Sequence, residues 1–201
     1  MVLWEVCIAA VVVLAGLVAW GNPVLREGIA KARLRIALCC FLNRPPWHLF
    51  RQVSLPGTSV RIDYVVISTC GMFVITLHYR PGSVEGNPEE AMWSQTLGRK
   101  RRVPLLNPLQ HNRQQIRLLA RSLDMPETMF TPLVVFLGRT WFTSPMPACV
   151  TLAGRAVSAI QQYREQVFSQ ETVERTVAML KRERSGEDTF SLQTDSTATS
   201  A

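Results

Sequence analysis

The sequence predicts a mixed α/β domain, of the α/β or α+β class, in which helices flank a central sheet and an apolar segment precedes the domain. Residues 24–42 place apolar side chains at helical spacing, whereas 59–68 and 72–79 are rich in β-branched residues. A second helical segment at 107–122 is followed by an apolar strand at 132–137. One helix, antiparallel strands, and then a helix and another strand are typical of such a mixed fold.

Local signals mark the ends of these elements. Pro45 and Pro46 end the first helix, because proline cannot continue a helix. Thr69-Cys70-Gly71 joins the two β-branched runs as a hairpin. The other expected elements are strands at 48–55, 83–85, 91–97 and 148–152, the helix that begins at Asn107-Pro108, and helices at 154–163 and 170–183.

The composition fixes the organisation of the chain. With 47% apolar and 18% charged residues, most of the 201 residues belong to a folded class. Residues 183–201 are rich in Ser, Thr, Asp and Glu and predict a disordered tail. We therefore expect an anchor at 1–23, a folded domain at 24–182 and the tail at 183–201.

The charge favours a polyanionic partner. Lys and Arg number 22 against 15 Asp and Glu, a net charge of +7, and the tail is acidic. Such an excess suits nucleic acid or an anionic membrane surface. The five cysteines include no CxxC pair and the three histidines are far apart in sequence, which argues against a disulfide framework or a structural zinc site. A reducing compartment fits these cysteines.

The N-terminal residues predict a single-pass membrane anchor over 3–20. Val6–Trp20 carries no charge, and about twenty helical residues cross a hydrocarbon core. A cleaved signal peptide and a buried core helix are the alternatives. Basic residues follow the segment, so the positive-inside rule predicts that the bulk of the chain is cytoplasmic, as at a bacterial inner membrane. These residues are Arg26, Lys31, Arg33 and Arg35.

The central part of the chain resembles a known family. No phosphate loop, GxGxxG after a strand or GxSxG elbow is present. Residues 51–86, RQVSLPGTSVRIDYVVISTCGMFVITLHYRPGSVEG, resemble the nuclease-related domain, NERD. The matching positions are Ile62-Asp63, Gly71, Gly82-x-Val84, Trp93 and Asn107-Pro108-x-Gln110. The resemblance implies a restriction-endonuclease-like fold of the PD-(D/E)xK class, with a mixed central sheet flanked by helices.

The same resemblance implies a catalytic site at known positions. Asp63 occupies the position of the family's metal-binding Asp, Thr76 that of its Glu, and His78 that of its Lys. Lys31 falls near a further family Glu, and Gln110 is expected beside the site. In an active enzyme these groups would hold Mg²⁺ and orient water. Asp63 is the one carboxylate left, which predicts a degenerate site with no cofactor, or Mg²⁺ at Asp63 if activity persists.

Several of these residues allow a second interpretation. Asp63 could instead be satisfied by Arg61 or by a neighbouring backbone amide, and Trp93 could belong to the core or stack on a base. A catalytic acid could also have migrated to another element. The candidates for such an acid are Glu27, Glu85, Glu89 and Glu90.

Two basic features predict a phosphate-binding surface. The run at 98–102, expected as a loop, contributes Arg99, Lys100, Arg101 and Arg102. Arg113, Arg117 and Arg121 recur every fourth residue and form one stripe on a helix. Both features could track a nucleic-acid backbone without sequence preference, or could simply be solvated.

Three functions remain open. The favoured one is a membrane-anchored NERD-like protein that binds nucleic acid or serves as a scaffold in DNA processing. The second is an active metal-dependent nuclease with a site rearranged around Asp63. The third is a component of a membrane complex that contacts only other proteins.

Overall fold

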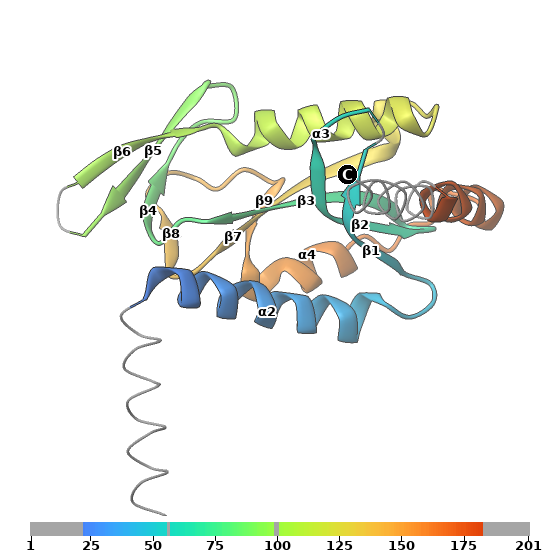
Figure 1. Cartoon of the computed structure of the whole chain (residues 1–201), viewed down its shortest axis with the longest axis horizontal. Helices are drawn as coiled ribbons and strands as arrows, with labels where there is room; N and C mark the ends of the chain where they lie inside the picture. Colours follow the sequence, from blue (N-terminus) through green and yellow to red (C-terminus); the bar gives the residue numbers. More distant parts are fainter. Residues whose placement is uncertain (1–21, 56, 99–100, 183–201) are drawn as a thin grey trace, which may run out of the picture.

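The computed structural model describes residues 22–55, 57–98 and 101–182, which form two sheets with helices on both faces of the larger one (Figure 1). The larger sheet has the strand order β1-β2-β3-β7-β9, and the smaller one the order β6-β5-β4-β8. The arrangement is a mixed α/β fold, as the sequence predicts.

The larger sheet combines an antiparallel meander with a parallel half. β1 (His48–Ser54), β2 (Arg61–Ser68) and β3 (Gly71–Tyr79) pair antiparallel, whereas β7 (Phe130–Leu137) runs parallel to β3, and β9 (Val150–Leu152) parallel to β7. The β2–β3 hairpin closes at the pair Ser68 and Gly71. The hydroxyl of Ser68 donates to the Gly71 carbonyl at 3.1 Å and accepts the Cys70 amide at 3.2 Å, which fixes the turn.

The smaller sheet extends from the end of β3. It consists of β4 (Gly82–Glu85), β5 (Met92–Leu97), β6 (Arg101–Leu106) and β8 (Thr140–Phe142). Gly82 begins it with a φ of +106°, and a Cβ there would lie 2.3 Å from the carbonyl oxygen of Thr96. Because only glycine fits this position, the chain can turn from one sheet into the other.

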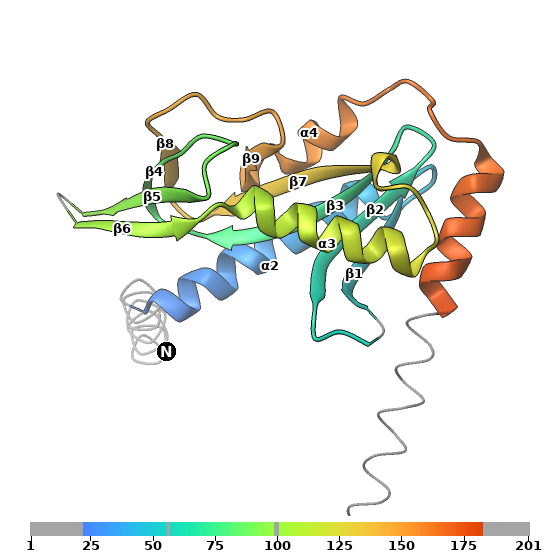
Figure 2. The same cartoon turned by 90° about the horizontal axis from the view of Figure 1, so that it is seen from above.

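Helices cover the larger sheet on both sides (Figure 2). α2 (Pro23–Leu42) and α4 (Ala156–Gln161) lie on one face, and α3 (Pro108–Ser122) and a helix at 170–182 lie on the other. Side chains of a strand alternate between faces. Phe73 and Ile75 therefore pack in the cluster under α2, whereas Met72 and Val74 pack under α3.

A third apolar cluster joins the two sheets. Trp93 of β5 is buried and lies parallel to Phe136 of β7, with ring centroids 6.5 Å apart. Its indole N–H donates to the carbonyl of Asn87 at 2.7 Å. Both the ring and its polar atom are thus engaged in the core, which leaves no exposed face for stacking on a base.

Most expected elements occur within a few residues of their predicted bounds, and two strands were not expected. The prediction of a loop at 98–102 is wrong for Arg101 and Arg102, because these two residues begin β6 and pair with β5. β6 is an edge strand, where Pro104 is tolerated. β8 has only three residues, too few for a sequence signal. The expected helix at 154–163 consists of a 3-10 turn, η2 (Ala153–Arg155), followed by α4.

Several predictions about the ends of the chain concern residues beyond those that the structure describes. None of the helices in 22–55, 57–98 and 101–182 is both long and apolar enough to cross a bilayer. The predicted anchor at 3–20, the predicted tail at 183–201 and the basic residues Arg99 and Lys100 lie outside the described residues.

Candidate functional site

Asp63 lies at the point where β2 and β3 diverge. The pairing of these strands ends at Tyr64 and Ile75, and Oδ2 of the half-buried Asp63 accepts the backbone N–H of Leu77 at 2.8 Å. Burial raises the pKa of Asp63, and the Leu77 hydrogen bond and the charges of Lys31 and His111 partly oppose this rise. A backbone amide, rather than the side chain of Arg61, is therefore the partner of this carboxylate.

Thr76 lies on the α3 face of β3 inside a neutral hydrogen-bond network. Its hydroxyl donates to Oε1 of Gln115 at 2.6 Å and accepts from Nδ2 of Asn112 at 2.7 Å. All three side chains are buried. The same amide of Asn112 donates to the Val74 carbonyl at 2.9 Å, and Nε2 of Gln115 donates to the Arg61 carbonyl at 3.1 Å. The network thus joins β2, β3 and α3 without any charged group.

His78 follows two residues later on the same face of β3 and lies among aromatic rings. Its ring centroid is 6.0 Å from that of Phe136 and 6.5 Å from that of His111. Burial, together with the charges of Arg80 and His111, lowers the pKa of His78 from 6.5 to about 4. The imidazole is therefore neutral near pH 7. Its Nε2 is buried and makes no hydrogen bond within the described parts of the chain.

Helix α3 presents other residues to this site than the sequence suggested. Gln110 is exposed, whereas Asn112 and Gln115 contact the strands directly and His111 faces His78. Asn112 and Gln115 are three residues apart and share a face with the buried Ile116. That spacing was the signal that could have identified them. The expected site residues Asp63, Thr76 and His78 do come together at adjacent strands.

The start of α3 explains the Asn107-Pro108 motif. The Asn107 side chain accepts the Leu109 amide at 2.9 Å and caps the helix, while its amide group donates to the carbonyls of Pro88 and Glu90 at 3.0 and 2.6 Å. Pro108 occupies the first helical position, where its missing N–H costs nothing. This motif therefore orients α3 over β3, the strand that carries both Thr76 and His78.

Comparison with known families agrees with this arrangement. The sequence model of the nuclease-related domain, NERD, matches residues 26–137, from the first turn of α2 to the end of β7. The match covers more than half of the chain. The chain belongs to the NERD family. This family is part of the PD-(D/E)xK-like nuclease superfamily. No curated protein and no solved structure matches the chain.

The metal site that the NERD family implies does not fit the residues present. Magnesium takes several oxygen ligands, usually with more than one carboxylate. Asp63 already binds an amide, and Thr76 is committed to neutral partners. Across the described ranges there is no group of three or more His, Cys, Asp or Glu residues that could hold a metal ion.

The acids that could have migrated do not repair the site. Glu27 pairs with Lys31 on α2 at 2.7 Å, and Glu85 pairs with Arg102 at 2.5 Å. Glu89 and Glu90 are exposed in the connection between β4 and β5. Where acids exist in this NERD domain, they are paired or exposed to solvent.

The predicted basic residues that the structure describes lie on β6 and α3. Arg113, Arg117 and Arg121 are all exposed on one side of α3, and Arg101 and Arg102 are exposed on β6. Figure 2 shows β6 leading directly into α3, so that both features lie along the same edge of the molecule. Two of these charges have partners, since Arg102 pairs with Glu85 and Arg117 lies 3.6 Å from Glu127.

Proposed function

We propose that this chain is a membrane-anchored NERD protein that has lost the metal chemistry of its superfamily and binds nucleic acid without sequence preference. The observation that carries the proposal is the Thr76–Asn112–Gln115 network, which fills the position of the family's metal-binding Glu with buried neutral groups. The Thr76 hydroxyl donates one hydrogen bond and accepts another, both with neutral side chains, so this position offers no negative charge to a cation.

The position of the family's lysine supports the same conclusion. A lysine there would carry a positive charge beside the reacting phosphate, whereas His78, with a pKa of about 4, is neutral at physiological pH. Thr76 and His78 therefore supply neither a second carboxylate nor a cation at the family's positions beside Asp63. The protein needs no cofactor in this function, and Mg²⁺ would enter only if cleavage persists.

The exposed arginines supply the binding surface. Arg113 and Arg121 make no ion pair in the described chain, and their stripe continues toward the basic start of β6. Guanidinium groups on a helix face contact phosphates without reading bases. The partner is thus a nucleic-acid backbone, with DNA processing as the setting.

The anchor places this surface at a membrane. The uncharged segment 6–20 directly precedes α2, and the basic residues of α2 follow it. By the positive-inside rule, the domain faces the cytoplasm from a single-pass helix, as at a bacterial inner membrane.

The test is a pair of assays on the full chain in a non-ionic detergent. Fluorescence anisotropy with duplex DNA should give an affinity that falls with salt, with a log–log slope of about −0.9 for each phosphate contacted. Incubation with plasmid DNA and Mg²⁺ or Mn²⁺ should yield no cleavage. Metal-dependent cleavage that Asp63→Ala abolishes would instead establish an active nuclease with a rearranged site.

A second candidate function is protein binding at the smaller sheet. Met92 and Leu106 are cross-strand partners on β5 and β6 and are 46% and 73% exposed. Exposed apolar pairs of this kind suit a protein partner in a membrane complex. A chain that binds neither DNA nor metal, but loses a co-purifying protein on Leu106→Ser, would favour this function.

A further inference from the structure

A hollow of the domain lies on the opposite face of the sheet from Thr76 and His78. It is a groove of about 760 Å³ between the first turns of α2, the ends of β3 and β7, and η2. Tyr79 lines it, and Tyr79 follows His78 on β3 and so points to the α2 side. The groove is therefore separate from the family's nuclease site.

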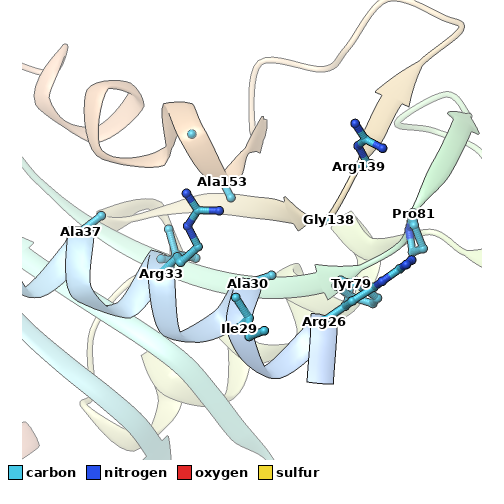
Figure 3. Close-up of a pocket in the computed structure, with 12 residues that line it drawn as sticks. Arg26, Ile29, Ala30, Arg33, Ala37, Tyr79, Pro81, Gly138, Arg139 and Ala153 are labelled. Carbon is cyan, nitrogen blue, oxygen red and sulfur yellow. The ribbon is translucent and has the colours of Figure 1, made fainter. Parts of the chain in front are cut away.

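Three arginines and no acid line this groove (Figure 3). Arg26 and Arg33 come from α2, and Arg139 comes from the turn between β7 and β8. Figure 3 shows Arg33 reaching toward Ala153, with Arg139 on the other side of the groove. Both of these residues are exposed and neither forms an ion pair with the described residues. Such an arrangement favours an anion with several oxygens.

Gly138 holds Arg139 in this position. Its φ of +89° belongs to the region that side chains rarely adopt, and a Cβ there would approach the Tyr79 ring to 3.0 Å. The turn after β7 thus requires glycine where it passes the Tyr79 ring, and the next residue, Arg139, lines the groove.

The rest of the lining is apolar, and it continues into an exposed apolar surface. Ile29, Ala30 and Ala153 contribute to the groove, and Ile29 is 49% exposed. Val24 and Leu25, one turn earlier on α2, are 74% and 44% exposed. Exposed aliphatic residues beside arginines at this end of α2 match the apolar and anionic layers of a membrane interface. A nucleic-acid backbone has no apolar part that would match this surface.

We propose that the groove binds the head group of an anionic glycerophospholipid, with Arg33 and Arg139 on the phosphate and Ile29 and Ala153 against the glycerol and first acyl carbons. This inference rests on the membrane anchor of the proposed function, because α2 begins directly after the apolar segment and its first turn is then held at the bilayer surface. The groove would fix the orientation of the domain on the cytoplasmic leaflet.

The test measures lipid and DNA binding by the full chain in a non-ionic detergent. The probes are fluorescent short-chain phosphatidylglycerol, the same label on phosphatidylcholine, and duplex DNA. An Arg33→Gln/Arg139→Gln variant should lose about fivefold in affinity for phosphatidylglycerol per arginine, about 25-fold in all, and keep its DNA affinity. The matched control, Arg113→Gln/Arg121→Gln on α3, should keep phosphatidylglycerol and lose DNA.

The apolar half of the site has its own variant. Ile29→Ser should weaken the binding of phosphatidylglycerol. Glycerol phosphate, which has no acyl chain, should bind the Ile29→Ser variant and the unchanged chain with equal affinity when it competes with the labelled lipid. Equal competition by inorganic phosphate and by phosphatidylglycerol would overturn the lipid assignment in favour of a simple phosphate site.

Other outcomes also decide the proposal. Unchanged phosphatidylglycerol binding in the Arg33/Arg139 variant, or equal binding of phosphatidylcholine, would overturn it. Loss of DNA binding in that variant would make the groove a nucleic-acid site. Extraction of the chain from membranes by alkaline carbonate tests the anchor separately, so a failed anchor can be distinguished from a failed groove.

Discussion

The two faces of the larger sheet have opposite character. On the α3 face, which carries the positions that the resemblance assigns to a nuclease site, Thr76 and its partners form an uncharged network, in which the buried Oδ1 of Asn112 has no hydrogen-bond partner among the described residues. On the α2 face, arginines line an open groove and have no acid among the lining residues. The comparison shows that the hydrogen-bonded polar groups and the arginines that line the groove lie on opposite faces of one sheet. If the proposed function holds, the α3 face contributes to stability, and the α2 face contributes to binding.

The largest effect should come from breaking the network on the α3 face. Asn112→Ala leaves the Val74 carbonyl and one side of Thr76 without a partner and opens a small cavity, so we expect a loss of about 2–3 kcal/mol in the free energy of unfolding. Urea unfolding of the full chain in detergent measures this. Gln110→Ala, an exposed change on the same helix, should alter stability by less than about 0.5 kcal/mol. Equal effects for both variants would show that the network is not structural.

Lowering the pH should reduce the free energy of unfolding through His78, which lies on the α3 face. Because its pKa falls from 6.5 to about 4 in the folded protein, the unfolded chain binds more protons between these values. The free energy of unfolding should therefore fall as the pH drops from 6.5 toward 4, by about 3 kcal/mol at most. His78→Gln should remove this part of the pH dependence. A pH profile identical in both proteins would mean that His78 is charged, or equally solvated, in the fold.

A smaller effect is expected on the α2 face from the turn after β7. Gly138→Ala places a side chain at a φ of +89° and against the Tyr79 ring, which should cost about 1–2 kcal/mol and lower phosphatidylglycerol affinity as Arg139 shifts. Gly28→Ala is the control, since a Cβ there meets nothing within 4 Å and Gly28 does not line the groove. Thermal unfolding and lipid titration of the two variants make the comparison. If Gly28→Ala proved as harmful, the geometry of the turn would not be the cause.

The smallest change in stability is expected from the arginines of α3, whose replacement should instead change DNA binding. Replacing Arg113 and Arg121 by Gln should reduce the log–log salt slope of DNA binding by about 2 units while stability changes by less than about 0.5 kcal/mol. Both side chains are exposed on α3. Anisotropy titrations at several salt concentrations provide the slope. An unchanged slope would place the DNA contacts on another surface.

The sequence predicted the elements better than their contacts. The hairpin at 69–71 and the helix from Asn107 were predicted from local turn and cap residues, which act within a few positions. β6 was missed because basic residues and Pro104 disguise an edge strand that exists only through its pairing with β5. Such pairing is a tertiary property that no local pattern reports.

The sequence predicted which residues occupy the family's site positions, but not which side chains surround them. Asp63, Thr76 and His78 were found through the family pattern, whereas Asn112 and Gln115 emerge only when α3 is laid on β3. The groove draws residues from α2, β3, the turn after β7 and η2. No spacing in the sequence joins these segments, so only the folded chain could show it.

The cap at Asn107 has a mechanical consequence. Its single side chain ties the first turn of α3 to the carbonyls of Pro88 and Glu90, and β6 ends at the residue just before it. The angle between the β5–β6 ribbon and α3 therefore depends on this amide group, together with the backbone hydrogen bond from Asn107 to the Ala91 carbonyl and the apolar cluster that contains Leu105 and Leu109. That angle determines how far the arginines of β6 lie from those of α3, and with it the length of polyanion that both can span at once.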